Sequence, residues 1–392
     1  MKHTISSIRD WLAGPTPVSI VLALAIGGVF MLIAGANPLE GFVAMFQGAL
    51  GNGLGISNTL QRAIPIVGLA MAVAIAFRAG VINLGAEGQM VLGGLVGGVV
   101  ALTMPGPPIL VTLCAVGAAM AAGALWGVLA ALLQSSMGVP ILISTLLLNY
   151  PARYFSSWVV RFPLKDPDSS MVASRAVDPA VQISPLIPKG SGLHDALADA
   201  FGSKSAIVMI GANVNWSLLI VIAVVAITVF MNRRTRFGFE SGIHGQNPEF
   251  ARYSGVHTNL LAIKTMALSG GLAGLFGVML VIGAPNTRII DGALLQTNFA
   301  WTGLLVALLA MYRPIGVAIA GTFFAAIIVG SAAAGRELAL SPQISAIIQA
   351  LVIILLAFRV RLPIFRRREA ASEAEDPPHQ LAAAVDNETG RN

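Results

Sequence analysis

Long apolar runs recur along this chain and limit what it can fold into. Hydrophobic residues make up 56% of its 392 residues and charged residues only 11%, and the mean hydropathy is +0.80. A membrane-spanning helix needs about 20 consecutive apolar residues, and the runs of this chain suffice for about ten such helices. Because lipid leaves backbone groups no outside partner, helices are expected in these runs. The sequence therefore predicts an all-α, polytopic membrane protein with short or re-entrant segments among its spans.

The apolar runs predict one membrane domain over residues 18–358, preceded by a cytoplasmic segment 1–17 and followed by a cytoplasmic tail 359–392. The tail is polar and mixed in charge, which predicts disorder. Residues 37–58 carry apolar side chains at helical spacing and predict an interfacial helix. The expected spans are about Val18–Ala36, Leu60–Phe77, Gln89–Met104, Ile109–Leu133, Pro140–Val160, Val214–Met231, Lys264–Gly283, Phe299–Met311, Ile315–Ala334 and Ile344–Phe358.

Basic residues gather in alternate loops, and this sets the expected orientation. The largest groups follow the sixth and tenth spans, where the chain reads NRRTR and RVRLPIFRRR. Cytoplasmic loops carry such an excess of Lys and Arg, so both termini are expected in the cytoplasm. Residues 161–213 then form a long extracellular loop, and residues 232–263 form the longest cytoplasmic loop. The formal net charge of +6 reflects this bias and does not indicate nucleic-acid binding.

The sequence lacks the usual signatures of an enzyme. No lysine stands in a G-x-x-x-x-G-K-[ST] context, and the five histidines form no H-E-x-x-H pair. Cys114 is the only cysteine, which excludes an intramolecular disulfide and a thiolate metal cluster. We therefore expect no catalytic residue, no cofactor and no metal site.

A glycine-dense stretch over residues 78–98 places polar side chains where the surroundings are apolar. It reads RAGVINLGAEGQMVLGGLVGG and contains Asn83, Glu87 and Gln89. A carboxylate at membrane depth is costly, so it suggests a functional site. Glu87 has two interpretations: a structural group paired with Arg78 or with free backbone N–H groups, or a group lining the translocation path.

Other polar residues of the spans leave similar alternatives. Asn149 and Tyr150 in the fifth span are expected either to hydrogen-bond between helices or to line a path. Trp301 and Arg313 are expected to be an interfacial anchor and a positive-inside charge. The glycine-rich runs 90–100 and 268–278 look alike, which fits either an internal repeat or close packing of small residues.

The longest cytoplasmic loop contains a short helix with a clear beginning and end. In GQNPEFARYSGV, Asn247 suits an N-cap, Pro248 the first helical position and Gly255 a left-handed terminus. Phe250 and Tyr253 lie three residues apart on one face, with Ala251 beside them, and could enter a groove of a partner protein. The alternative is a short helix packed on its own domain.

Together these motifs carry a resemblance. INLGAEGQ, followed later by RTRFG, GQNPEFARYSGV and LAIKTMALSGGLAGLFGVM, resembles the inner-membrane permeases of ABC importers for simple sugars, nucleosides and branched-chain amino acids. The similarity extends over nearly the whole chain, and the NLGAEGQ run is most similar to the nucleoside-type permeases. The run 239–244 departs from the family pattern, so the resemblance implies docking to an ATPase but does not imply which one.

The resemblance implies a transport subunit of the bacterial inner membrane with no catalysis of its own. Such permeases work in pairs, often with a related but different chain, above ABC ATPase subunits and below a periplasmic or lipoprotein substrate-binding protein. The expected path residues are Asn83, Glu87, Gln89 and Asn149. The expected coupling residues, on the helix that would contact the ATPase, are Gly245, Gln246, Asn247, Phe250, Ala251, Arg252 and Gly255.

Two further function classes stay open at this point. An ion- or proton-coupled secondary transporter would use Glu87 as its coupling carboxylate, and a membrane scaffold or channel would need neither ATP nor a binding protein. Within the permease interpretation, nucleosides are the first expected substrate, simple sugars the second and branched-chain amino acids the third.

Overall fold

The computed structural model describes residues 25–33, 35–203, 205–283, 287–292, 298–339 and 350. It divides into two units, of which Glu40–Ser345 contains nearly all of the labelled helices. In the other unit, residues 25–33 are helical, so the first expected span is described only in part. The tenth expected span, 344–358, and the tail lie outside the described residues apart from residue 350.

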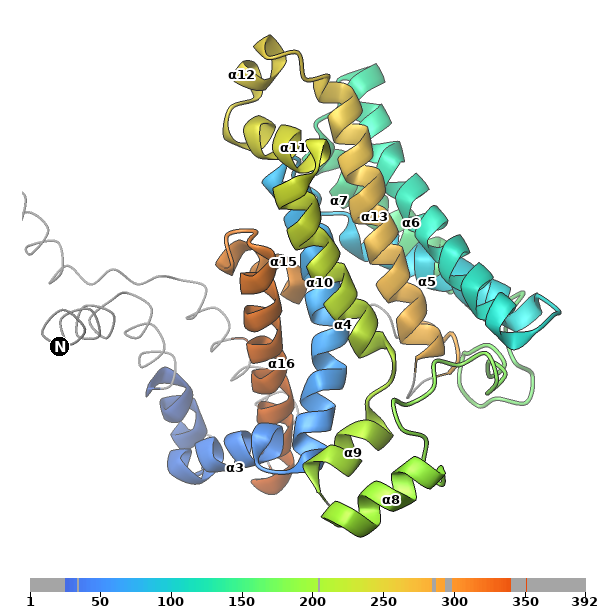
Figure 1. Cartoon of the computed structure of the whole chain (residues 1–392), viewed down its shortest axis with the longest axis vertical. Coiled ribbons are helices and arrows are strands. Elements are labelled where there is room, and N and C mark those ends of the chain that lie inside the picture. The colour runs from blue at the N-terminus through green and yellow to red at the C-terminus, as the bar shows by residue number, and fades with distance from the viewer. Residues whose placement is uncertain are drawn as a thin grey trace, which may run out of the picture. The chain divides into compact units, whose positions relative to one another are not determined.

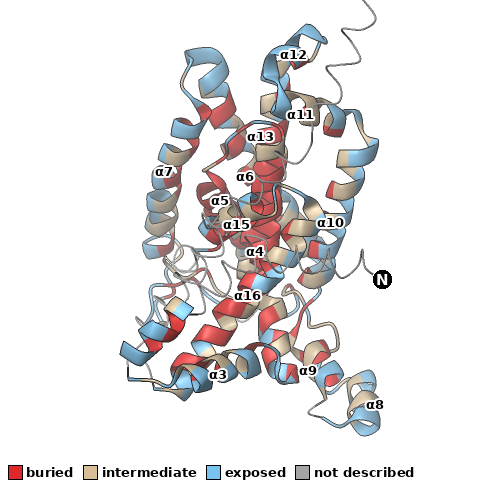
Figure 2. Ribbon diagram, turned by 90° about the vertical axis from the view of Figure 1, so that its left-hand side faces the viewer, coloured by how far each residue is buried: buried red, intermediate tan, exposed pale blue. Residues whose placement is uncertain are grey.

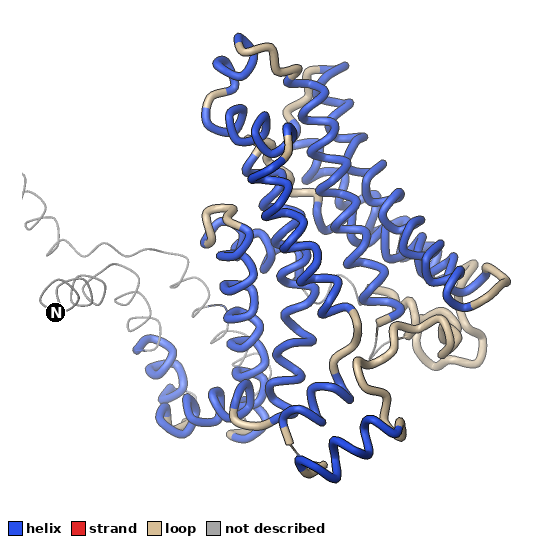
Figure 3. The backbone as a smooth tube through the Cα atoms, in the orientation of Figure 1, coloured by secondary structure: helices blue, strands red, loops and turns tan. Residues whose placement is uncertain are grey.

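Helices dominate the described residues, which contain two isolated β-bridges and no longer strand (Figures 1 and 3). The helices are α3 (Pro38–Leu50), α4 (Gly53–Arg78), α5 (Ala86–Thr103), α6 (Pro108–Met137), α7 (Ile141–Arg161), α8 (Gly192–Phe201), α9 (Ala206–Asn213), α10 (Ser217–Arg234), α11 (Arg236–Gln246), α12 (Pro248–Tyr253), α13 (Thr258–Ile282), α15 (Phe299–Leu309) and α16 (Pro314–Glu337).

Six of these helices are long and apolar enough to cross a membrane, or up to seven if residues 25–33 and α3 form one bent span. The six are α4, α5, α6, α10, α13 and α16. Helices α7 and α15 also coincide with expected spans, but α15 has only 11 residues and α7 does not meet the same criteria. The all-helical, polytopic prediction is therefore confirmed, whereas the total of about ten spans stays a prediction.

Three segments differ from the expected pattern. The interfacial helix predicted over 37–58 ends at Leu50, because Asn52 caps α4 by accepting a hydrogen bond from the Gly55 N–H at 2.8 Å. Helix α4 thus begins well before the expected Leu60 and carries Pro65 inside it. The predicted loop 161–213 is partly helical, since it contains α8 and α9.

Helices α5, α6 and α13 pack closely through small residues, as the composition suggested. A Cβ added at Gly93 would stand 2.2 Å from the Gly274 Cα, and one at Gly123 would stand 2.2 Å from the Gly270 carbonyl oxygen. The two glycine-rich runs of the sequence therefore lie against each other, on α5 and α13. Figure 2 shows the buried residues along α4, α5, α6 and α13.

The ends of the bundle carry different connections. Helices α11 and α12 lie at one end, and α8 and α9 at the other (Figure 1). At the α8 and α9 end, Arg161 pairs with Asp291 at 2.6 Å and Arg288 with Asp166 at 3.1 Å. The balanced charges of the segment 161–213 and of the loop after α13 therefore partly neutralise each other.

Candidate functional site

The glycine-dense stretch contains a break between two buried helices. Helix α4 ends at Arg78, α5 begins at Ala86, and Gly80 between them has a φ of +72°, which favours glycine. Such a break frees backbone groups that must find partners inside the protein, because lipid offers none. Side chains from three helices supply those partners.

Asn83 organises the break from within and is fully buried. Its Oδ1 accepts a hydrogen bond from the Gly85 N–H at 2.8 Å, and its Nδ2 donates to Gln89 Oε1 and Ser269 Oγ, each at 2.9 Å. The Ser269 hydroxyl donates onward to the Ala72 carbonyl at 2.7 Å. Asn83 and Gln89 thus connect the break to α4 and α13, and their polar atoms form hydrogen bonds within the protein.

Asn149 holds the break from α7. Its Oδ1 accepts from the Gly88 N–H at 2.8 Å, and its Nδ2 donates to the Leu84 carbonyl at 2.9 Å. Thr145, one turn earlier on α7, accepts from the Leu84 N–H at 3.2 Å. The structure therefore places Asn83, Gln89 and Asn149 in a network around one helix break. A substrate contact for these three residues stays a prediction.

Glu87 is bound in a different way, by side chains on two other helices. Its Oε1 lies 2.7 Å from Arg153 Nη2 on α7, and its Oε2 accepts from Trp301 Nε1 on α15 at 2.9 Å. Its place in the first turn of α5 also suits the positive end of that helix. Arg78, the partner considered from the sequence, is not involved: its guanidinium lies beside Gly242 on α11.

The ion pair joins the interior to an open surface. The Glu87 side chain is only 8% exposed, whereas the Arg153 side chain is 40% exposed. Trp301 is 42% exposed, and its indole N–H donates inward to the Glu87 carboxylate. The prediction of an interfacial anchor did not include this contact. Glu87, Arg153 and Trp301 are called the charged triad below. The carboxylate of Glu87 is therefore buried, whereas the two side chains that bind it are partly exposed at the protein surface.

An aromatic face on α7 begins beside the charged triad. The Arg153 guanidinium carbon lies 5.9 Å from the Tyr150 ring centroid. Further along, Phe155 and Trp158 stack with centroids 6.2 Å apart, and Trp158 meets Phe162 at 6.5 Å. All four aromatic rings are exposed. This face exposes flat apolar rings next to a charged group.

The short helix predicted in the loop 232–263 has the expected form. Asn247 Oδ1 accepts from the Phe250 N–H at 3.0 Å, Pro248 occupies the first turn of α12, and Gly255 has a φ of +82°. Ala251 is buried against the protein, while Phe250 and Tyr253 are 57% and 88% exposed. Helix α12 thus packs through one face and leaves two aromatic side chains uncovered. Gln246 and Arg252 are also exposed.

The end of α11 rests directly on the end of α4. His244 Nδ1 lies 2.7 Å from the Ala79 carbonyl oxygen. A Cβ at Gly245 would stand 2.1 Å from the Arg78 carbonyl oxygen, so only glycine permits this approach. The predicted coupling residue Gly245 therefore lies against the start of the segment from Arg78 to Glu87, which contains two of the predicted path residues.

Sequence reasoning missed several residues of these sites. Arg153 has no role among the sequence-based predictions, although an arginine inside an apolar run is itself a signal. Arg62 on α4 gives the same signal; its guanidinium carbon lies 4.4 Å from the Phe299 ring centroid, and its buried Nε has no hydrogen-bond partner among the described residues. The pairing of Trp301 with Glu87 spans 214 residues, and no local pattern could have shown it.

Comparison with known proteins identifies the family of this chain. The family model for the permease component of branched-chain amino acid transport systems matches residues 55–357. The chain belongs to this family of ABC importer permeases. The permease is 31% identical over 354 residues to a glucose ABC transporter permease of Haloferax volcanii, covering 89% of this chain and 88% of the relative.

Two further relatives carry nucleoside names. A nucleoside ABC transporter permease of Lactococcus lactis is 27% identical over 360 residues, covering 92% of this chain and 94% of the relative. A guanosine ABC transporter permease of Bacillus subtilis is 26% identical over 343 residues, covering 87% and 91%. The permease is thus a transport subunit and not an enzyme, and family membership decides against an ion-coupled secondary transporter.

Proposed function

We propose that this permease forms the membrane path of an ATP-driven importer for nucleosides, with simple sugars as the second candidate class. The relatives named above transport a nucleoside, guanosine and glucose according to their names. Nucleosides, including guanosine, and glucose all present a hydroxyl-rich ring. Branched-chain amino acids, named by the family model, are the third class.

The observation that carries this proposal is the link between α12 and the charged triad. A displacement of α12 would pass through α11 and the contact of Gly245 with Arg78 to the break that precedes Glu87. In this mechanism, ATP-driven closure of two ATPase subunits moves α12 and shifts α5 relative to α7 and α15. The ion pair between Glu87 and Arg153 would then open or close with the path.

The chemistry of the aromatic face supports the substrate class. Aromatic side chains stack on nucleobases, at about 1–3 kcal/mol per base, and do so for every base because each has a π-face. The rings on α7, with Tyr150 nearest the charged triad, would receive a base or the apolar face of a sugar. Arg153 and Glu87 offer a donor and an acceptor for hydroxyl groups.

The assembly we propose follows from the exposed surfaces and from the charge pattern. The uncovered side chains of α12 would enter a groove of an ABC ATPase, and a second, related permease would complete the path. A periplasmic or lipoprotein binding protein would deliver substrate at the α8 and α9 end. The protein would lie in a bacterial inner membrane with both termini cytoplasmic, and α7, α15 and residues 344–358 would bring the spans to about ten.

The test is transport by the complete complex in proteoliposomes. With the ATPase, sister permease and binding protein present, radiolabelled nucleosides, pentoses and hexoses are offered with and without internal ATP. The proposal expects ATP-dependent uptake of a nucleoside, competed by other nucleosides and less by sugars. Uptake of sugars alone would overturn the nucleoside assignment and leave the importer assignment intact.

A further inference from the structure

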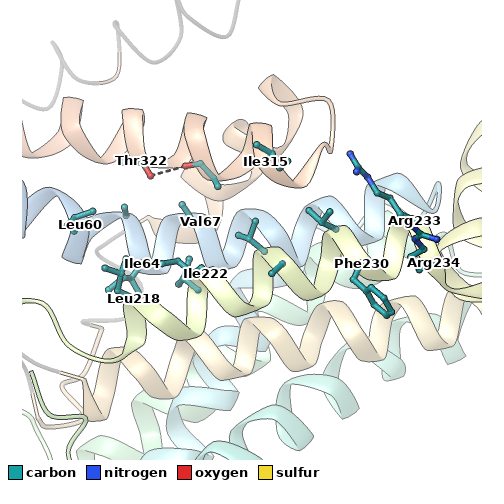
Figure 4. A pocket seen from close by; sticks show the side chains of 16 residues that line it. Leu60, Ile64, Val67, Leu218, Ile222, Phe230, Arg233, Arg234, Ile315 and Thr322 are labelled. Atoms are coloured by element: carbon teal, nitrogen blue, oxygen red, sulfur yellow. Dashed lines mark hydrogen bonds between the residues drawn. The ribbon is translucent and has the colours of Figure 1, made fainter. Parts of the chain in front are cut away.

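One cavity among the described residues lies away from the charged triad. It is a groove of about 690 Å³ between α4, α10 and α16 (Figure 4). Its walls include Leu60 and Val67 on α4, Leu218 and Phe230 on α10, and Ile315 on α16. Its chemistry differs from that of the aromatic face, and it is called the α10 groove below.

The walls of the α10 groove offer almost nothing to a polar ligand. Apart from two arginines, the only polar side chain among its described lining residues is that of Thr322, and the Thr322 hydroxyl already donates to the Ala318 carbonyl at 2.8 Å. A nucleoside placed there would lose its hydrogen bonds to water without replacement, which is costly. The groove therefore suits a hydrocarbon chain and not the transported substrate.

One end of the groove is positively charged. Arg233 and Arg234 line it in the last turn of α10, and both are exposed. Within the described residues neither pairs with a carboxylate, whereas Arg236, just beyond them, pairs with Glu240 at 2.6 Å. In Figure 4 the two arginine side chains lie together at the end opposite Leu60 and Leu218.

The length of the groove fits a membrane lipid. From Leu218 to Arg233 the axis of α10 rises about 22 Å at 1.5 Å per residue, against about 30 Å for the hydrocarbon core. The arginines therefore stand near one surface when the apolar part lies in the core. The positive-inside pattern makes this the cytoplasmic surface, where basic pockets between helices bind anionic headgroups.

We propose that the α10 groove binds an anionic phospholipid of the cytoplasmic leaflet. Its acyl chain would lie along Phe230 and Ile315, and its phosphate would pair with Arg233 and Arg234. The terminal apolar segments of the chain are less suitable occupants. Their cytoplasmic flanks, with Arg9 or with Arg359 and Arg361, would bring like charges to the same two arginines. This proposal does not depend on the substrate.

The experiment measures lipid binding to the full-length permease by native mass spectrometry, with phosphatidylglycerol, phosphatidylcholine and glycerol phosphate as probes. Phosphatidylglycerol is expected to bind at least tenfold more tightly than phosphatidylcholine, and glycerol phosphate, which lacks acyl chains, is expected not to compete. Equal binding of the two lipids, or competition by glycerol phosphate, would overturn the proposal.

Variants locate the site. Replacing both arginines, Arg233→Gln with Arg234→Gln, is expected to weaken phosphatidylglycerol binding about thirty-fold, which corresponds to about 2 kcal/mol. The double lysine variant should retain most of the binding, and Arg236→Gln, outside the groove, should retain all of it. Unchanged binding by the double glutamine variant would place the lipid elsewhere.

A groove-filling substitution separates a bound lipid from a bound helix. Ala226→Trp, in the wall of the α10 groove, should displace the lipid while both arginines remain. In native membranes, a disulfide between cysteines placed at Ala226 and within 344–358, in a chain with Cys114→Ser, would show that the chain covers its own groove. That result would overturn the proposal, whereas its absence together with lipid displacement would support it.

Discussion

At the scale of single residues, the polar side chains of the helix break fall into two groups. The side-chain polar atoms of Asn83 and Asn149 are hydrogen-bonded to backbone and amide partners, which favours a structural role. Glu87 is held by Arg153 and Trp301, which are both partly exposed, so its contacts can change without unfolding the core. This difference leads to opposite predictions for substitutions only a few residues apart.

Removing Asn83 should destabilise the protein. Asn83→Ala leaves the Gly85 N–H and the Gln89 and Ser269 side chains short of partners in the interior. Buried unsatisfied groups cost about 1–3 kcal/mol each, so a loss of at least about 2 kcal/mol is expected. Thermal unfolding of the purified chain measures it, with Asn259→Ala at an exposed position as the matched control. A melting temperature equal to that of the control variant would refute the structural role.

Replacing Glu87 should impair transport more than stability. Glu87→Gln keeps an oxygen for the Trp301 N–H but removes the charge that pairs with Arg153. A hydrogen bond to a charged group contributes about 1.5–3 kcal/mol, so uptake should fall about tenfold or more while assembly survives. Vesicle uptake and co-purification of the complex measure the two effects.

A second substitution tests whether the pair acts as a unit. If Glu87 and Arg153 open and close together, Glu87→Gln combined with Arg153→Gln should reduce uptake little beyond either change alone. Additive losses would mean that the two side chains act independently. Loss of assembly in Glu87→Gln would favour the purely structural interpretation.

At the scale of elements, α11 contacts the end of α4, and α12, which follows α11, has an open face. The Gly245 backbone approaches the Arg78 carbonyl too closely for any larger residue. On the other side, Phe250 and Tyr253 are exposed. In the proposed mechanism, transmission of force depends on the first contact, and docking on the second.

Enlarging Gly245 should uncouple ATP hydrolysis from transport. Gly245→Val must push α11 away from α4, because its Cβ would overlap the Arg78 carbonyl. We expect ATPase binding to persist, ATP hydrolysis to lose its stimulation by substrate, and uptake to fall at least tenfold. Gly242→Ala is the matched control, since its Cβ would meet only the movable end of the Arg78 side chain at 3.2 Å. Normal uptake by Gly245→Val would exclude this route.

These elements show what sequence could and could not predict. The α12 helix was predictable because Asn247, Pro248 and Gly255 act locally on the backbone. The partners of Glu87 were not, because Arg153 and Trp301 come to it from α7 and α15 through tertiary packing. The start of α4 was placed too late because the cap at Asn52 precedes the apolar run on which the prediction relied.

At the scale of the whole molecule, the two described ends of the bundle carry different side chains. Basic side chains and the aromatic residues of α12 lie at one end, and the ion-paired loops with α8 and α9 lie at the other. Between them, α4 and the helix break connect the coupling contact to the charged triad. In the proposed mechanism, movement at one end becomes a change in the path at the charged triad.

The exposed aromatic residues of α12 test the central claim most directly. Phe250→Ala with Tyr253→Ala changes side chains that contact little of the permease itself, so its melting temperature should stay within a few degrees of wild type. In proteoliposomes containing the complete importer, we predict that this double variant loses bound ATPase and at least nine-tenths of ATP-dependent nucleoside uptake. Full ATP-dependent uptake by the double variant, or uptake by the isolated permease without ATP, would contradict the account.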